Sequence, residues 1–260
     1  MDGGFSFKKG NIPYLTCDGI TFTHGFSTRE GGVSHGNGLD TLDLGMGDEN
    51  DVYENRRRFA SALNCDISSM FSAKQIHSAK IVTVTSSDIG KRFECDGFVT
   101  NKKGLLLTVK VADCVPILFS DEKNGVIAAV HAGWRGTANG IAAEAVKAMA
   151  ELGADTHYIK AAIGPCIHSC CYEVDVPFVN AVKETRCGGE LMRFITPSDK
   201  EGKFYADLPS MNLHLLTLCG LSPTNINVSL HCTCCESDVF FSHRASGGKR
   251  GLMMAGIVMN

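Results

Sequence analysis

Residues Leu105–Gly136 read LLLTVKVADCVPILFSDEKNGVIAAVHAGWRG and contain three apolar runs that are rich in β-branched residues. The runs are Leu105–Val111, Val115–Phe119 and Val126–Val130, and a turn at Asp121–Gly125 separates the last two. Continuous apolar runs of this length, bounded by turn residues, predict strands that are buried on both faces. The chain is therefore expected to be organised around these three strands.

Polar residues interrupt and end these strands. Asp113 and Cys114 separate the first two runs, and His131 follows the third. A polar group buried without a partner raises the free energy of the fold, so these residues are expected to be paired. The glycines of Gly133–Gly136 indicate a sharp corner between strand and helix. We expect the chemistry of the protein at this corner.

The composition excludes several classes of protein. The 260 residues are 44% hydrophobic and 20% charged, which is enough apolar material for a sizeable core. The formal net charge of −3 gives no electrostatic basis for binding nucleic acid or an anionic membrane. No segment approaches the roughly 18 uninterrupted apolar residues of a membrane span. The N-terminal segment MDGGFSFKKG lacks the apolar core of a signal peptide, so the sequence predicts a cytoplasmic protein.

Twelve cysteines are present. Disulfide frameworks belong to short secreted chains, whereas this chain is long and has many core residues. We therefore expect reduced thiols, most of them small buried hydrophobes and only a few with a function.

The other elements follow from periodicity and capping residues. Apolar residues recur at helical spacing in four segments and form shorter apolar runs elsewhere. The predicted helices begin near Asp48, Ile141, Asp175 and Asp207, and further strands are predicted at 81–85, 159–163, 226–230, 239–241 and 253–258. Because there is no internal repeat or linker, we predict a single domain over residues 1–260, with helices that flank a mixed sheet.

His77, Cys114 and His131 each stand at the edge of a predicted strand. Imidazole and thiolate ligands suit zinc, and three protein ligands with a fourth position open are typical of a catalytic site. No short spacing ties the three residues together, so alternatives stay open. Cys114 could be a nucleophile that His131 activates. It could also be a packed thiol, with both histidines bonded to backbone carbonyls.

Two further segments have a possible role at an anion or a substrate. Ser27–Ser34 is rich in glycine and contains Arg29, and backbone N–H groups in such a loop can face an anion. A solvent-exposed loop is the simpler interpretation. Trp134, the only tryptophan, could stack on a substrate ring or fill the corner. Arg135 could face an anion or cap a carbonyl.

A second candidate for a metal site is the segment His231–Cys235, which reads HCTCC. Closely spaced cysteines can hold zinc or an iron–sulfur centre. Four-ligand sites usually combine two separated pairs, however, and Cys166, Cys170 and Cys171 do not form a regular second pair. We therefore interpret these cysteines as buried thiols, with metal binding as the alternative.

Several short motifs together resemble one family. They are Gln75-Ile76-His77-Ser78, Ala112-Asp113-Cys114-Val115-Pro116, His131-Ala132-Gly133-Trp134-Arg135-Gly136, Ile163-Gly164-Pro165-Cys166 and Cys171-Tyr172-Glu173-Val174, with FSTREGGVS at 26–34 and FSHR at 241–244. The combination resembles the YfiH/YlmD family, long labelled laccase-domain or polyphenol oxidase proteins. The resemblance extends from about residue 20 to the C-terminus.

This resemblance implies an α/β (α+β) fold, a single-domain α/β/β/α layered sandwich with mixed sheets, distantly similar to cysteine hydrolases of the cytotoxic-necrotizing-factor type. It also implies that His77, Cys114 and His131 are the catalytic and zinc-binding residues. Family members are purine nucleoside phosphorylases, which act on adenosine, inosine, guanosine or methylthioadenosine with phosphate and also deaminate adenosine. The alternative is a zinc or cysteine amidase that edits peptidoglycan precursors.

Five residues are candidates for contacts to substrate or phosphate, namely Arg29, Asp43, Arg135, Arg244 and Arg250. The chain departs from the family pattern at two of them. A frequent Ser-Leu-Asn-Leu-Gly pattern is replaced here by TLDLG at 41–45, and Arg250 is displaced by two places from a family arginine. A carboxylate only accepts hydrogen bonds whereas an amide also donates, so the contact at Asp43 is the weaker prediction.

Copper oxidase chemistry is not expected despite the family label. A multicopper oxidase needs about ten histidines grouped into separate copper sites, whereas this chain has nine in all, scattered along the sequence. Copper is expected only as a substitute for zinc, which the Irving–Williams order favours. The implied partners are purine nucleosides and inorganic phosphate, and a monomer is compatible with the sequence.

Overall fold

The three central strands lie in two different sheets. The computed structural model describes residues 3–36 and 41–260. Strand β8 (Val115–Asp121) pairs with β9 (Val126–Ala132) in one six-stranded sheet, while β7 (Leu106–Val111) belongs to another. All residues of these strands are buried except the half-buried Lys110. The prediction of three strands buried on both faces is confirmed, and the tripeptide between β7 and β8 crosses from one sheet to the other.

The strands of the described residues form three sheets. The first has the order β1 (Phe5–Lys8), β2 (Tyr14–Cys17), β3 (Thr23–Ser27), β15 (Met253–Val258), β7 and β4 (Met70–Phe71). The second has the order β14 (Ile226–Val228), β10 (Lys160–Ile163), β8, β9, β6 (Gly97–Thr100) and β5 (Ile81–Thr83). A small third sheet has the order β11 (Glu173–Asp175), β13 (Lys203–Ala206) and β12 (Ile195–Pro197). Both large sheets contain parallel as well as antiparallel pairs, so both are mixed.

Four of the six helices in the described residues begin where the sequence predicted them, near Asp48, Ile141, Asp175 and Asp207, whereas the short helices at 134–138 and 188–191 were not predicted. The six helices are α1 (Glu49–Ala62), α2 (Trp134–Ala138), α3 (Ile141–Glu151), α4 (Val176–Lys183), α5 (Gly188–Leu191) and α6 (Leu208–Leu218), with 3-10 turns at 67–69, 86–88, 192–194 and 223–225. The side chains of Asp48, Asp175 and Asp207 each accept a hydrogen bond from a backbone N–H of the first turn. These bonds satisfy donors that have no partner inside the helix.

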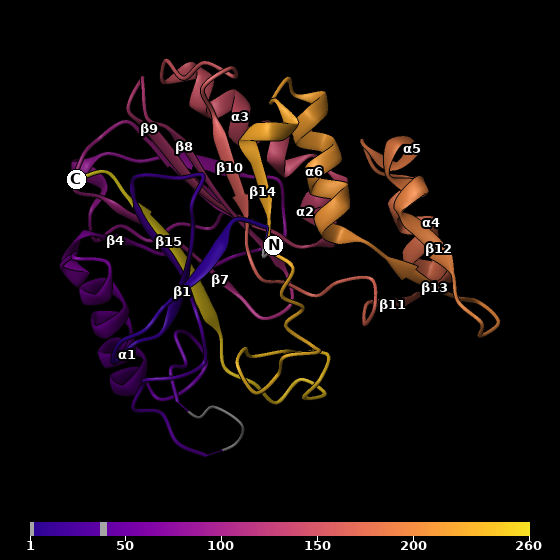
Figure 1. Ribbon diagram of the computed structural model, residues 1–260, viewed down its shortest axis with the longest axis horizontal. Helices are drawn as coiled ribbons and strands as arrows, with labels where there is room; N and C mark the ends of the chain where they lie inside the picture. Colours follow the sequence, from indigo (N-terminus) through magenta and orange to yellow (C-terminus); the bar gives the residue numbers. More distant parts are fainter. Residues whose placement is uncertain (1–2, 37–40) are drawn as a thin grey trace.

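Four layers result from this arrangement. Figure 1 shows α1 on one side of the molecule and α3 and α6 on the other. Phe59 of α1 packs with Leu106 on the outer face of the first sheet. Leu107 and Leu118 belong to the core between the sheets, and Ile117 belongs to the core beneath α3 and α6. Neighbouring side chains of a strand point to opposite faces of its sheet and so belong to different cores. The predicted α/β/β/α sandwich is therefore confirmed.

One predicted strand is wrong. Residues 239–241 lie among turns and bends rather than in a strand, although Phe240 and Phe241 are fully buried. They fill the core between the two sheets from a loop, and an apolar run does not distinguish that role from a strand. In the part of the chain that the structure describes, every helix is too short or too polar to cross a membrane.

Candidate metal centre

The crossing between the two sheets delivers Cys114 to the end of β9. Val115 pairs with Ala132 and Pro116 with His131 in the antiparallel register of β8 and β9. Cys114, which immediately precedes β8, therefore lies beside the end of β9. The strand pairing alone thus brings the predicted thiol and one predicted imidazole to the same edge of the second sheet.

Asp113 fixes the crossing through three hydrogen bonds. Its backbone has a positive φ of 86°, a conformation that is uncommon for residues other than glycine. Its carboxylate accepts from the Thr233 hydroxyl at 2.7 Å and from the Arg244 backbone N–H at 2.7 Å. Its carbonyl accepts from the N–H of Ile167 at 2.9 Å. These contacts hold the strained turn that precedes Cys114, and they explain the buried charge between two apolar strands.

His77 reaches the same place from the loop before β5. The Gln75 side-chain amide donates to the carbonyl of Lys110 at 2.8 Å and accepts from its N–H at 2.7 Å, so the loop is bound to β7. His77 itself has a positive φ of 56°. The N–H of His77 donates to the Asp96 carboxylate at 2.9 Å, which holds this conformation.

The ligand atoms of His77, Cys114 and His131 all lie within 4.8 Å of one another. The two imidazole rings are 4.9 Å apart and almost perpendicular, at 89°. The structure therefore brings together the three residues that the sequence singled out, from three separate segments of the chain.

Asp96 is the residue that the sequence analysis missed. Its carboxylate is fully buried and accepts hydrogen bonds from His131 Nδ1 at 2.9 Å, from the N–H of His77, and from both the N–H and the hydroxyl of Ser78 at 2.7 Å. A hydrogen bond at Nδ1 leaves Nε2 of His131 available to a metal, as carboxylates beside metal-binding histidines do. The available signal was an aspartate directly before the buried strand β6.

The electrostatics of the group favour a thiolate. Burial raises the pKa of Cys114, but hydrogen bonds to His131 and His77 outweigh it and hold the pKa at about 6. Burial lowers the pKa of His131, yet the bonds to Asp96 and Cys114 raise it to about 9. Burial also opposes ionisation of Asp96, whose bonds to His131 and Ser78 nevertheless lower its pKa to about 2. At neutral pH the sulfur therefore carries the negative charge that a metal ligand needs.

Gly133 provides the space that an ion would need. A Cβ atom placed on Gly133 would lie 3.2 Å from a ring carbon of His77, 3.4 Å from Cys114 Sγ and 3.5 Å from a ring carbon of His131. The absent side chain therefore leaves room between all three candidate ligands. Two imidazoles, one thiolate and an open side match the ligand set of a catalytic zinc site, so these residues fit the metal.

We expect Gly133→Ala to weaken metal binding strongly while the protein stays folded. The backbone of Gly133, at φ −66° and ψ 167°, suits alanine, so only the crowding of the three candidate ligands changes. Zinc per chain after dialysis against a weak chelator would measure the loss. Gly189→Ala is the matched control, because a Cβ atom there meets nothing within 4 Å. Equal zinc retention in both variants would contradict this use of Gly133.

Two predicted arginines lie on aromatic rings near this group. Arg135 lies over the ring of Trp134 at 4.2 Å, and Trp134 also packs 4.9 Å from Phe178. Arg244 lies 5.4 Å from the ring centre of Tyr172 and donates to the carbonyl of Cys171 at 2.9 Å. Trp134 therefore fills the corner, as one interpretation predicted. A contact of Arg135 or Arg244 with a substrate stays a prediction.

The glycine-rich loop does not present its N–H groups to an anion. The N–H groups of residues 29, 30, 32, 33 and 34 donate instead to protein oxygens, so the interpretation as an anion-binding loop is wrong for these groups. Residues 29–33 are half-buried or exposed, in agreement with the simpler interpretation as a solvent-exposed loop. Arg29 donates to the carbonyl of Ser237 at 2.7 Å and lies over the ring of Phe241. Arg29 and Arg250 nevertheless line one cavity of about 180 Å³, together with Lys249.

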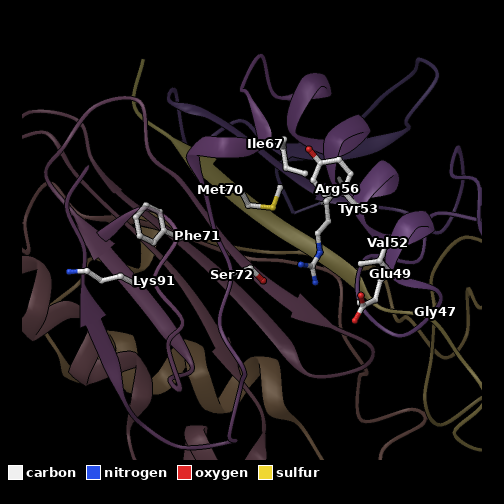
Figure 2. Close-up of a pocket in the computed structure, with 12 residues that line it drawn as sticks. Gly47, Glu49, Val52, Tyr53, Arg56, Ile67, Met70, Phe71, Ser72 and Lys91 are labelled. Atoms are coloured by element: carbon white, nitrogen blue, oxygen red, sulfur yellow. The ribbon is translucent and has the colours of Figure 1, made fainter. Parts of the chain in front are cut away.

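Asp43 organises a loop. It is fully buried, and its two oxygens accept from the N–H groups of residues 45, 46, 47 and 252. A contact of Asp43 with substrate stays a prediction. The same loop borders a larger cavity of about 660 Å³ between α1 and β4, with Arg56 and Tyr53 in its lining (Figure 2). Its volume suits a small molecule, but none of the three candidate ligands lines it.

Comparison with known proteins finds relatives that match most of the chain. Residues 23–260 match the family described as "Multi-copper polyphenol oxidoreductase laccase". The chain is 36% identical to "Purine nucleoside phosphorylase YlmD" of Geobacillus stearothermophilus, over 96% of this chain and 95% of that protein. It is 33% identical to "Adenosine deaminase RL5" from an unknown prokaryotic organism, over 89% and 92% of the two chains.

A solved structure has the same fold. The crystal structure of the Bacillus licheniformis hypothetical protein YfiH superposes with a TM-score of 0.89 at 32% identity, over 98% of this chain and 99% of that chain. The match to the family covers all three candidate ligands and both large sheets beyond β2. The chain therefore belongs to the laccase-domain family that includes YlmD and YfiH.

Proposed function

We propose that the protein is a zinc-dependent purine nucleoside phosphorylase that also deaminates adenosine. The observation that carries the proposal is the group of His77, Cys114 and His131, with Asp96 orienting His131 and Gly133 leaving space for an ion. The names of the relatives supply the reaction class, since they include phosphorylases and a deaminase. Adenosine, inosine, guanosine and methylthioadenosine are the proposed substrates.

Zinc held by these three residues would supply an electrophile and lower the pKa of a coordinated water. The chain's own groups have the other tasks. Asp96 keeps His131 in the tautomer whose Nε2 is free, and the turn at Asp113 fixes the direction of the thiolate. The rings of Trp134 and Tyr172 pack against Phe178 and hold the side chains of Arg135 and Arg244.

Phosphorolysis also requires a place for phosphate. As the glycosidic bond breaks, positive charge develops on the sugar carbon, and an anionic acceptor must be held nearby. The cavity with Arg29, Lys249 and Arg250 has three cationic side chains. Nε of Arg250 is buried and has no hydrogen-bond partner among the described residues. The segment that lines this cavity also provides the Arg244 N–H that holds Asp113 next to Cys114, so we assign phosphate to it.

Copper oxidase chemistry finds little support in the arrangement of ligands. Among the described residues, histidines gather with other potential metal ligands only at His77 and His131. A multicopper oxidase needs several such groups. Copper in place of zinc at the same three ligands remains compatible with their chemistry.

A cysteine amidase is the second candidate function. The low pKa of Cys114 and its hydrogen bond to His131 are also the features of an activated cysteine nucleophile. The two functions differ in their need for metal, because a thiolate nucleophile works without an ion.

The deciding experiment supplies adenosine with and without inorganic phosphate and follows the products by chromatography. We expect adenine and ribose 1-phosphate, at a rate that saturates with phosphate and nearly vanishes without it. Inosine formation should persist without phosphate, because water is its only other reactant. Equal adenine release in both conditions would show a hydrolase, and release of an amino acid from a muramyl precursor by metal-free protein would show the amidase.

The same assay tests the phosphate site. Arg250→Gln should raise the phosphate concentration for half-maximal adenine release by roughly tenfold or more, since a charge-assisted hydrogen bond contributes about 1.5–3 kcal/mol. Inosine formation should change much less. Arg193→Gln is the control, because that arginine is exposed and pairs with Glu190 on the surface. An unchanged phosphate dependence in Arg250→Gln would move the phosphate site elsewhere.

A further inference from the structure

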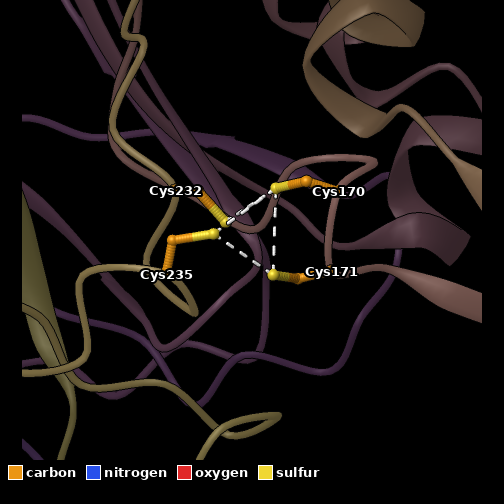
Figure 3. A group of neighbouring side chains, drawn as sticks. All are labelled: Cys170, Cys171, Cys232 and Cys235. Atoms are coloured by element: carbon orange, nitrogen blue, oxygen red, sulfur yellow. Dashed lines mark hydrogen bonds between the residues drawn. The ribbon is translucent and has the colours of Figure 1, made fainter.

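The structure brings four cysteines from two distant segments together, and we propose that they bind a second, structural zinc ion. Cys170 and Cys171 lie in the turn between β10 and β11, and Cys232 and Cys235 follow β14. Figure 3 shows their sulfur atoms converging on one point. The interpretation as buried thiols is wrong for Cys170 and Cys235, because both side chains are exposed.

The spacing of the sulfur atoms matches a single tetrahedral ion. Sγ of Cys170 lies 3.8 Å from that of Cys171 and 3.6 Å from those of Cys232 and Cys235, and Sγ of Cys171 lies 3.3 Å from that of Cys235. Four sulfurs bound to zinc at about 2.3 Å are about 3.8 Å apart when the geometry is tetrahedral. An iron–sulfur cluster would place several irons and sulfides between its cysteines, and sulfurs this close leave room for one ion.

The chemistry of the group also favours a metal. Cys170 and Cys235 are exposed and Cys171 is half-buried, and only Cys232 is buried. Exposed thiols gain nothing from apolar burial, so burial does not explain why the other three converge on Cys232. Cys232 and Cys235 have the C-x-x-C spacing that is common in zinc sites, and four thiolates select zinc over harder cations. The backbone N–H of His168 points at Cys232 Sγ, 3.5 Å away, and such bonds stabilise a thiolate ligand.

The position of the group defines its role. Cys166 and Cys232 form a backbone bridge, so the two cysteine segments already run side by side. Thr233, between the cysteines of the second segment, bonds the carboxylate of Asp113, and Arg244 bonds both Asp113 and the carbonyl of Cys171. An ion shared by the two segments would therefore hold Thr233 and Arg244 in place, and through them the turn at Asp113 that positions Cys114. It shares no ligand with the group of His77, Cys114 and His131, and only the total of two zinc ions per wild-type chain rests on the proposed function.

The test is the amount and the ligand shell of the bound zinc, in protein purified with reductant. The wild-type chain should contain two zinc ions, and Cys170→Ser/Cys235→Ser should contain one. In Cys114→Ala, X-ray absorption at the zinc edge should show a shell of four sulfurs at about 2.3 Å. The double variant should instead retain zinc bound mainly through nitrogen. Its thermal unfolding temperature should fall, and a chelator should lower that temperature less than it lowers that of Cys114→Ala.

Cys234→Ser is the matched control. Cys234 belongs to the same stretch but not to the group of four, so this variant should keep two zinc ions. Unchanged zinc in Cys170→Ser/Cys235→Ser would overturn the second site, as would loss of a zinc ion from Cys234→Ser. A mixed nitrogen and sulfur shell in Cys114→Ala, or a disulfide among the four cysteines by mass spectrometry, would do the same. Failure of the site proposed for catalysis would appear separately, as unchanged zinc and activity in Cys114→Ala.

Discussion

Cys114→Ala is expected to remove one zinc ion per chain and to lower adenosine phosphorolysis by about 100-fold or more. Loss of a residue that merely orients a metal ligand costs 10–100-fold in affinity or activity, and loss of a ligand should have at least that effect. The thiolate is also the only negative charge among the three candidate ligands. Elemental analysis and the phosphate-dependent assay measure the two losses on the same preparation.

The fold should survive this substitution. Cys114 precedes β8, and the pairing of β8 with β9 does not use its side chain. Far-ultraviolet circular dichroism should therefore match the wild type, with Cys65→Ser as the control for loss of an unrelated thiol. Wild-type protein stripped of metal provides the second comparison, and it should be as inactive as Cys114→Ala. Full activity after complete chelation would exclude the metal mechanism and favour Cys114 as a free nucleophile.

The fold could be predicted from the sequence to the extent that local patterns decide it. The runs that became β7, β8 and β9 are apolar throughout, and the capping aspartates marked α1, α4 and α6. Strand pairing is not local, and nothing in the three runs shows that β7 pairs with β15 while β8 pairs with β9. The predicted strand at 239–241 was wrong for a different reason, because a buried loop and a buried strand require the same apolar residues.

The residues of the candidate site also fall into those that the sequence identifies locally and those that only the folded chain reveals. His77, Cys114 and His131 could be chosen because residue chemistry and family motifs single them out. Asp96 could not, because its importance lies in four donors that converge only in the folded chain. The sequence offered the cysteines of His231–Cys235 as a metal site only as an alternative to buried thiols. Cys170 and Cys171 were not joined to them, because the two pairs are about sixty residues apart in sequence. The parallel pairing of β10 with β14 and the bridge between Cys166 and Cys232 bring these pairs together in the folded chain.

Asp96→Ala is expected both to destabilise the folded protein strongly and to remove the metal. The substitution leaves Nδ1 of the buried His131 and the N–H groups of His77 and Ser78 without their acceptor. Removing one partner of a buried, hydrogen-bonded charge pair costs about 3–5 kcal/mol. For a chain of this size that corresponds to a fall of about 10 °C in the unfolding temperature. Zinc affinity at the site should fall at least 10–100-fold, because the ring of His131 loses its orientation.

The pH dependence of stability gives an independent check on Asp96. Its pKa is lowered from 3.8 to about 2 in the folded protein, so the carboxylate stabilises the fold above pH 3.8 and loses this effect as the pH falls towards 2. The difference in unfolding free energy between wild type and Asp96→Ala, measured without metal, should therefore shrink over that range. A difference that stayed constant would mean that the substitution acts through packing rather than through the charge.

Asp121→Ala separates lost stability from lost metal binding. Asp121 is also fully buried, and it accepts from the N–H groups of Asn124 and Asp155 and from the Asn124 side chain. It ends β8 at the turn into β9, away from Cys114 at the strand's beginning. Both variants should therefore unfold at lower temperature, but only Asp96→Ala should lose the zinc bound by His77, Cys114 and His131. If the two variants lost equal amounts of zinc, the metal loss would follow from general destabilisation and not from the orientation of His131.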